Sequence, residues 1–260
     1  TAAIAFLVYF NVVVAPNIAP PFVPTPTETR DPVSFEIEAD GLAIEGKFLA
    51  AIETYQAAIN ANPKNIDNYL KIARLQIYSG NYSQAQVNAE NCILLDKSNA
   101  DAFALLGWAK GLQKHYLEGE RDAQSAIALD PNNAIGHAIW AYLLALRVEV
   151  GANELNTVDL AIEESRTALA LDANLLESRW ARGYVLEITS NYAEAAEQYE
   201  VAVQLNTNIA QLHLALGRNY MTLGRLDEAV FEFTKAYSLN PTDPVPNYFI
   251  SRVYANLGEW

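Results

Sequence analysis

The chain has 260 residues, 51% of them hydrophobic, and its 31 acidic and 17 basic side chains give a formal net charge of −14. A chain of this length and apolar content can bury a core as one long domain or as an array of repeats. The acidic surplus argues against a nucleic-acid-binding protein, which needs a basic footprint, and against docking on anionic lipid headgroups.

The first 23 residues form a hydrophobic segment without a charged side chain, since the first one is Glu28. Its apolar run ends before Pro16, so it is shorter than the roughly 20 residues of a membrane-spanning helix. We expect an extended arm that packs on a neighbouring subunit, with the remnant of a membrane anchor as the alternative. The side chains expected to make this attachment are Ile4, Phe6, Leu7, Val8, Tyr9, Phe10, Val12, Val13 and Val14.

Residues 24–31 are rich in Pro and Thr and predict a semi-rigid linker. From Pro32 onward, small and aromatic residues recur every 34 residues. The clearest copy, residues 210–243, predicts two helices that are separated at Gly224 and end at Asn240 and Pro241. A pair this short cannot bury its own apolar face, so we expect a stack of such pairs. The units begin at Pro32, Ile66, Ala100, Ala134, Leu176 and Ala210, with a partial seventh from Pro244.

The recurring pattern is a small residue at the eighth, twentieth and twenty-seventh positions of a unit and, in several units, an aromatic residue at the seventeenth or twenty-fourth. The fifth unit shows the pattern with Gly183, Tyr192, Ala195, Tyr199 and Ala202. Residues 32–260 therefore resemble the tetratricopeptide repeat (TPR) family. The resemblance implies an all-α, right-handed α-solenoid of about six complete helix pairs plus a partial seventh. First helices would line a concave groove and second helices would form the convex back.

Catalysis is not expected, because the candidate residues are scattered. His137 and His213 occupy equivalent positions two units apart, about 20 Å by helix-packing distances, so they cannot share a metal ion. His115 lies alone in a turn, and Cys92 replaces a small packing residue. We therefore expect a non-enzyme without a metal or cofactor.

The resemblance places the fifth and ninth residues of each first helix on the groove. They predict a largely apolar, aromatic middle with arginines toward both ends, and the lysine and asparagine pair of the carboxylate-clamping subfamily is absent. Such a groove should bind an extended apolar segment with few charges. Packing of these rings on neighbouring helices is the open alternative. The expected groove residues are Leu70, Arg74, Trp108, Tyr142, Trp180, Tyr184, Leu214, Arg218, Tyr248 and Arg252.

These features predict a protein–protein interaction and assembly protein. The leading hypothesis is self-assembly, with the arm of one subunit in the groove or on the end face of the next. Head-to-tail contacts that do not close would produce a filament outside the cell. The alternative is a membrane-anchored scaffold on the extracytoplasmic side, because no Lys or Arg follows the apolar run until Arg30. A third hypothesis is that the repeats regulate an enzyme domain beyond Trp260. In the first two cases we expect an extracytoplasmic, cell-surface or secreted protein.

Overall fold

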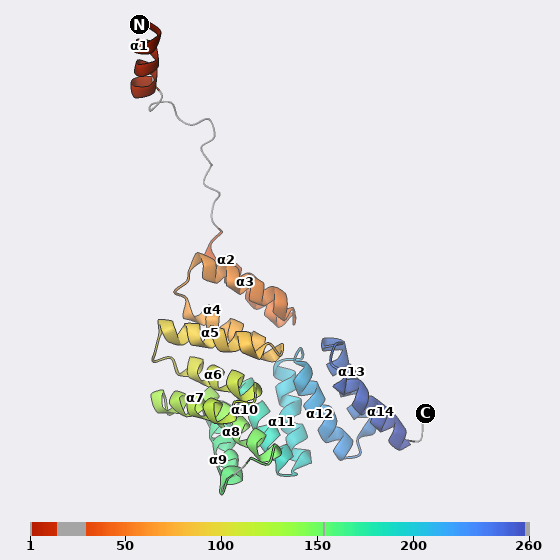
Figure 1. Cartoon of the computed structure of the whole chain (residues 1–260). Helices are drawn as coiled ribbons and strands as arrows, with labels where there is room; N and C mark the ends of the chain where they lie inside the picture. Colours follow the sequence, from red (N-terminus) through yellow and green to blue (C-terminus); the bar gives the residue numbers. More distant parts are fainter. Residues whose placement is uncertain (1, 15–29, 153, 258–260) are drawn as a thin grey trace. The chain divides into compact units, whose positions relative to one another are not determined.

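The computed structural model describes residues 2–14, 30–152 and 154–257, and the regular elements in these ranges are helices. The chain divides into two compact units, residues 1–31 and residues 32–260. Figure 1 shows the course of the chain.

The N-terminal unit contains α1 (Ala2–Tyr9), which continues as a π-helical turn, η1 (Phe10–Val14). The expectation of an extended conformation is therefore wrong for residues 2–14. Ala2, Ala3 and Ala5 favour a helix, and helical hydrogen bonds satisfy the backbone without a partner strand. No residue of α1 is buried, so the helix does not shield its own apolar side chains from water. Residues 15–29, with the rest of the expected arm and most of the linker, lie outside the described part.

The helices of the described ranges fall short of a bilayer span. None of them combines the length and the hydrophobicity that such a span requires.

The second unit is a stack of antiparallel helix pairs, which confirms the predicted α-solenoid of six pairs and a partial seventh (Figure 1). The pairs are α2 (Pro32–Ile44) with α3 (Phe48–Ala61), α4 (Ile66–Tyr78) with α5 (Tyr82–Leu95), α6 (Ala100–Leu112) with α7 (Tyr116–Leu129), α8 (Ala134–Glu149) with α9 (Thr157–Leu171), α10 (Leu176–Ile188) with α11 (Tyr192–Leu205), and α12 (Ala210–Thr222) with α13 (Leu226–Leu239). The last helix, α14 (Val245–Leu257), packs on α13.

The small residues act where paired helices approach most closely. A Cβ atom on Gly217 would lie 2.6 Å from the ring of Phe233, and one on Gly183 would lie 2.9 Å from the ring of Tyr199. Such distances are far inside van der Waals contact, so each aromatic ring of the second helix fills the space that a first-helix glycine leaves. The repeat consensus therefore encodes helix–helix packing.

Each turn within a pair needs one residue in the left-handed region. Gly46, Gly80 and Gly224 have φ of +77°, +80° and +77°, while Lys114 and Ser190 occupy the same place at 71° and 62°. Glycine is the residue that adopts this conformation without a steric cost. The backbone geometry of these turns thus favours glycine, and Lys114 and Ser190 adopt it at a steric cost.

The fourth pair carries the insertion that lengthens its unit. Arg147, at the end of α8, donates to Glu120 Oε1 at 3.0 Å, to the Ala152 carbonyl at 2.9 Å and to Glu154 Oε1 at 3.1 Å. One buried guanidinium thus ties the inserted loop to α7 of the preceding pair.

Candidate functional site: the inner face of the solenoid

The inner face is built from α4, α6, α8 and α10, and the aromatic side chains expected there are mostly buried. Only 1% of Trp108, 7% of Trp180 and 6% of Tyr184 is exposed, and Tyr142 is partly buried. The expectation of an open aromatic groove is therefore wrong for Trp108, Trp180 and Tyr184. The alternative, that these rings pack on neighbouring helices, describes the structure.

The rings pack on one another because the first helices meet across the axis of the superhelix. The ring centroids of Trp108 and Trp180 lie 5.3 Å apart, and those of Tyr142 and Tyr184 lie 4.9 Å apart. Tyr78 joins the cluster at 6.4 Å from Trp180, which connects the second pair to the fifth. Each aromatic ring removes a large apolar area from water, so this cluster fills the middle of the solenoid.

Two of the predicted groove arginines are paired with glutamates that sequence reasoning missed. Arg74 Nε lies 3.0 Å from Glu177 Oε1, and Arg218 donates to Glu187 Oε1 at 2.9 Å. Only 2% of Glu177 is exposed, and its carboxylate also accepts from the Tyr78 hydroxyl at 2.9 Å. The signal was present, because Glu177 and Glu187 fall at groove-facing positions of their first helix.

Burial and contacts with carboxylates raise the pKa values of two tyrosines, Tyr78 and Tyr184. Burial and the neighbouring Glu177 carboxylate hold the pKa of Tyr78 well above its usual range. Burial and a hydrogen bond to Glu149 raise the pKa of Tyr184 in the same way. Both phenols therefore stay protonated at neutral pH and act as hydrogen-bond donors.

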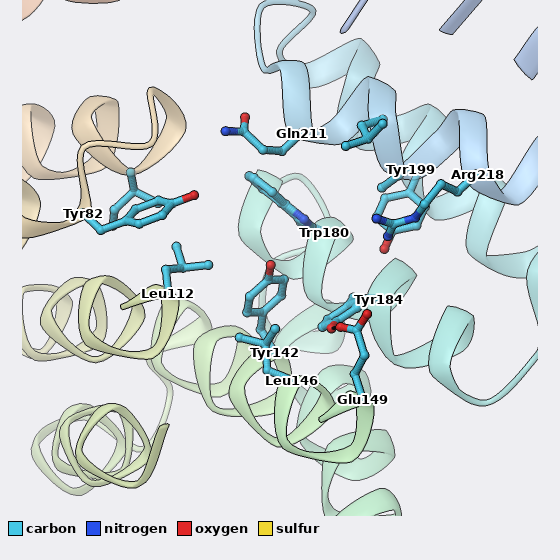
Figure 2. Close-up of a pocket in the computed structure, with 13 residues that line it drawn as sticks. Tyr82, Leu112, Tyr142, Leu146, Glu149, Trp180, Tyr184, Tyr199, Gln211 and Arg218 are labelled. Atoms are coloured by element: carbon cyan, nitrogen blue, oxygen red, sulfur yellow. Dashed lines mark hydrogen bonds between the residues drawn. The ribbon is translucent and has the colours of Figure 1, made fainter. Parts of the chain in front are cut away.

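A cavity of about 190 Å³ remains beside the aromatic cluster. Figure 2 shows Trp180, Tyr142 and Tyr184 on one part of its wall, with Tyr82 from α5 and Gln211 from α12 at other parts. Arg218 and Glu149 add charged groups to the lining. Since an apolar cavity of about 150 Å³ can hold a benzene molecule, this space suits one ring-sized side chain.

The remaining predicted groove residues divide between this cavity and the ends of the inner face. Leu214 lines the cavity, while Leu70 packs against the core. Tyr248 on α14 is 59% exposed, and the Arg252 guanidinium lies 5.7 Å from its ring. The structure thus does not bring all ten residues together in one open surface, and their part in partner binding stays a prediction.

Two of the three histidines, His137 and His213, occupy equivalent packing positions. His137 Nδ1 lies 2.5 Å from Glu164 Oε2, and its Nε2 lies 3.0 Å from the Pro131 carbonyl. His213 repeats the arrangement with Glu232 at 2.6 Å and the Thr207 carbonyl at 3.0 Å. The hydrogen bond to Glu164 raises the pKa of His137. Each ring faces an acceptor on both sides, so these residues serve to join helices.

Cys92 and the acidic side chains are the remaining groups that could react or bind a metal ion. Cys92 is fully buried, and burial raises the pKa of its thiol to about 12, so it is protonated at neutral pH. Within the described residues, no group of three or more His, Cys, Asp or Glu side chains could hold a metal ion.

The comparisons with known proteins agree with this architecture. The family model described as "Tetratricopeptide repeat" matches residues 210–243, which are the α12–α13 pair and the loop after it. Residues 210–243 are a tetratricopeptide repeat, and the other helix pairs have the same architecture. No curated protein is similar enough in sequence to count as a relative of this chain.

Solved structures show the same fold at low sequence identity. A thermophilic TPR protein of Thermus thermophilus is 17% identical, has a TM-score of 0.59, and aligns over 73% of this chain and 99% of its own. A chain of the APC/C hetero-tetramer Cut9–Hcn1 is 14% identical, has a TM-score of 0.61, and aligns over 87% of this chain and 44% of its own. The TPR fold implies a protein–protein interaction or scaffold role.

Proposed function

We propose that this TPR protein is a non-catalytic assembly scaffold, that it binds an apolar protein segment, and that the segment belongs to another copy of the chain. The observation that carries the proposal is the exposed apolar surface of residues 2–13. Six of its side chains are more than half exposed. They are Ile4, Phe6, Leu7, Val8, Tyr9 and Val12. Apolar surface gathered in this way marks an interaction site, since each side chain gains about 1.5–3 kcal/mol when it is fully buried.

The solenoid supplies a complementary surface. Its inner cavity suits one aromatic side chain, and the exposed segment carries three, those of Phe6, Tyr9 and Phe10. A segment that binds a different copy gives a head-to-tail contact, which extends into a filament when the rotation between copies does not close.

The test is the molar mass of the purified full chain in buffer without detergent, from light scattering, together with electron micrographs. We expect assemblies at micromolar concentration and monomers after deletion of residues 1–23. A matched pair of substitutions separates a specific contact from general hydrophobicity. Leu7→Ser should weaken assembly, whereas Leu155→Ser, at a side chain that is 91% exposed in the inserted loop, should not. A full-length chain that remains monomeric contradicts self-assembly.

The second candidate is a membrane-tethered, extracytoplasmic scaffold of a membrane protein complex. The helical conformation of residues 2–14 favours it, because a backbone in lipid must satisfy its hydrogen bonds internally. No Lys or Arg lies between the end of the apolar run and Arg30, which supports the extracytoplasmic side. In vesicle flotation, this candidate predicts that the full chain floats with neutral vesicles and that the chain without residues 1–23 does not.

A further inference from the structure

The solenoid closes on itself at a contact between its first turn and the loop that joins α11 to α12. Asn208 Nδ2 donates to the Ile44 carbonyl at 3.2 Å, across 164 positions of sequence. A Cβ atom on Gly46 would lie 2.4 Å from Asn208 Cγ, so a side chain at this position would have to displace the Asn208 side chain. Figure 1 shows the ends of α3, α12 and α13 on the same side of the solenoid. We call this contact the closure.

A cleft of about 700 Å³ lies beside the closure. Its walls come from the start of α3, the turn between α4 and α5, the start of α12 and the loop after α13. Its volume falls within the roughly 300–1,000 Å³ that is typical of ligand sites. The cleft is bordered by helix ends and turns, and it is distinct from the aromatic cluster on the inner face.

The lining of the cleft is apolar and amide-rich, with a single charged side chain. Phe48, Leu49, Tyr78 and Leu239 supply the apolar part, and the amides come from Asn81, Asn208, Gln211 and Asn240. The charged residue is Lys47, whose Nζ already lies 2.7 Å from Glu45 Oε2. A charged ligand would lose its hydration here without gaining an unpaired countercharge, so the cleft favours an uncharged one.

Hydrogen-bonding groups in the cleft match a peptide backbone. The α3 helix begins without a side-chain cap, so its first backbone N–H groups, on residues 48–50 of the cleft wall, have no side-chain acceptor. The Gln211 Oε1 atom is buried and has no hydrogen-bond partner among the described residues. Asn81 makes no side-chain cap on α5. Together these groups offer donors for peptide carbonyls and acceptors for peptide N–H groups.

Gln211 lies between this cleft and the inner cavity, because it is a lining residue of both. In Figure 2 it lies at the rim of the cavity above Trp180. A backbone in the cleft would therefore pass a side chain by Gln211 into the space of about 190 Å³ between the aromatic residues.

We propose that the cleft binds an extended, uncharged peptide segment through its backbone, and that one ring-sized apolar side chain of the segment enters the inner cavity past Gln211. This inference rests on the proposed function, because it names the surface and the chemistry by which the scaffold holds a partner segment. The proposed ligand is an extended peptide segment and not a folded helix that docks on the solenoid.

A labelled synthetic nonapeptide with the sequence of residues 15–23 is a suitable probe, because it has no charged side chain and carries one aromatic ring, Phe22. Fluorescence anisotropy with the full chain should show saturable binding. The F22A peptide should bind about 10- to 100-fold more weakly, which corresponds to the loss of about 1.5–3 kcal/mol when a Phe side chain is no longer buried.

Variants of the full chain locate the site. Gln211→Ala and Asn81→Ala should each weaken binding of the peptide about fivefold to tenfold, as expected for the loss of one hydrogen bond. Among the described residues Gln211 Oε1 has no hydrogen-bond partner and Asn81 makes no side-chain cap on α5, so the variants should unfold at the urea concentration of the parent. The control is Gln124→Ala, an exposed amide on α7 outside the cleft. No binding of the peptide, or equal binding by all three variants, would overturn the inference.

The outcome separates this inference from the proposed self-assembly. If the full chain stays monomeric but binds the peptide with the expected dependence on Gln211, peptide binding in the cleft is supported and self-assembly is contradicted. The opposite outcome is that the parent chain assembles, and that Gln211→Ala and Asn81→Ala assemble and bind the peptide as the parent does. Self-assembly is then supported, and peptide binding in the cleft is contradicted.

Discussion

Repeats that are distant in sequence meet in two regions of this solenoid, and the two contacts are of different kinds. In the middle, the second and fifth pairs are joined by Tyr78, Trp180 and the ion pair of Arg74 with Glu177. At the closure, the first turn meets the α11–α12 loop through one side-chain hydrogen bond and the close approach of Gly46. The middle is a core, and the closure is a narrow bridge beside the cleft.

The difference indicates where the molecule can open. Segments with few buried apolar contacts separate at lower free energy than those that share a core. The aromatic cluster should therefore keep its geometry while the closure opens, and a partner segment would gain access from the closure side. Four predictions test this contrast.

The largest effect is expected from Trp108→Ala in the aromatic cluster. Trp108 is almost fully buried and contacts Trp180 and Tyr142, so its removal leaves a cavity that costs about 3–5 kcal/mol of the free energy of unfolding. Urea denaturation followed by circular dichroism measures this loss. Tyr248→Ala, at a more exposed ring, should cost less than about 1 kcal/mol. Similar losses for both variants would mean that the cluster is not a core.

The second prediction concerns Glu177→Gln, which removes the charge that faces Arg74. An arginine without its countercharge should lower the free energy of unfolding by about 2–4 kcal/mol. The loss should lie toward the lower end, because the Arg74 side chain is partly exposed. Replacing Arg74 with Leu in the same chain should recover part of the loss in a double-mutant cycle. Glu45→Gln, which changes an exposed pair with Lys47, is the control and should have almost no effect. A Glu177→Gln loss as small as the control's would contradict a structural ion pair.

The third prediction compares two turn glycines with almost the same backbone. Ala at Gly46 or Gly80 strains the left-handed turn by about 1–2 kcal/mol in either place. A Cβ atom on Gly80 meets open space, whereas one on Gly46 meets Asn208, so Gly46→Ala should cost about 1 kcal/mol more. Adding Asn208→Ala to Gly46→Ala should remove that excess. Equal losses in the two single variants would show that the closure is not formed in solution.

The smallest effect concerns pH and the repeated histidine contact. The pKa of His137 is raised in the folded chain, so its protonated ring stabilises the fold below its unfolded pKa, and this stability is lost as pH rises through the folded value. The free energy of unfolding should fall by about 1 kcal/mol from pH 6 to above the raised pKa, the size of one charge-assisted hydrogen bond. His137→Gln should flatten this dependence, and His115→Gln, at an exposed histidine, should leave it unchanged. Stability that rises over the same interval in the parent and not in His137→Gln would contradict the assignment.

The sequence predicted the helix pairs well and the inner face poorly. The expected helices at 210–223 and 226–239 correspond to α12 and α13 almost residue by residue, because Gly224 and Pro241 mark their ends locally. Whether Trp108 and Trp180 face water depends on the curvature of the whole stack, which accumulates from small rotations between repeats. Residues 2–14 were misjudged because an apolar run without a period is compatible with a strand or a helix.

The bridge between Ile44 and Asn208 also bears on how the chain folds. Contacts between neighbouring repeats link residues that are close in sequence, so such arrays fold fast and fray independently at their ends. A contact that spans 164 positions closes a long loop and gives no stability until most of the repeats are in place. This contact should therefore form late in folding. It should also make amide hydrogen exchange near Ile44 faster when the sixth helix pair unfolds. An array with this bond loses the independence of its two ends.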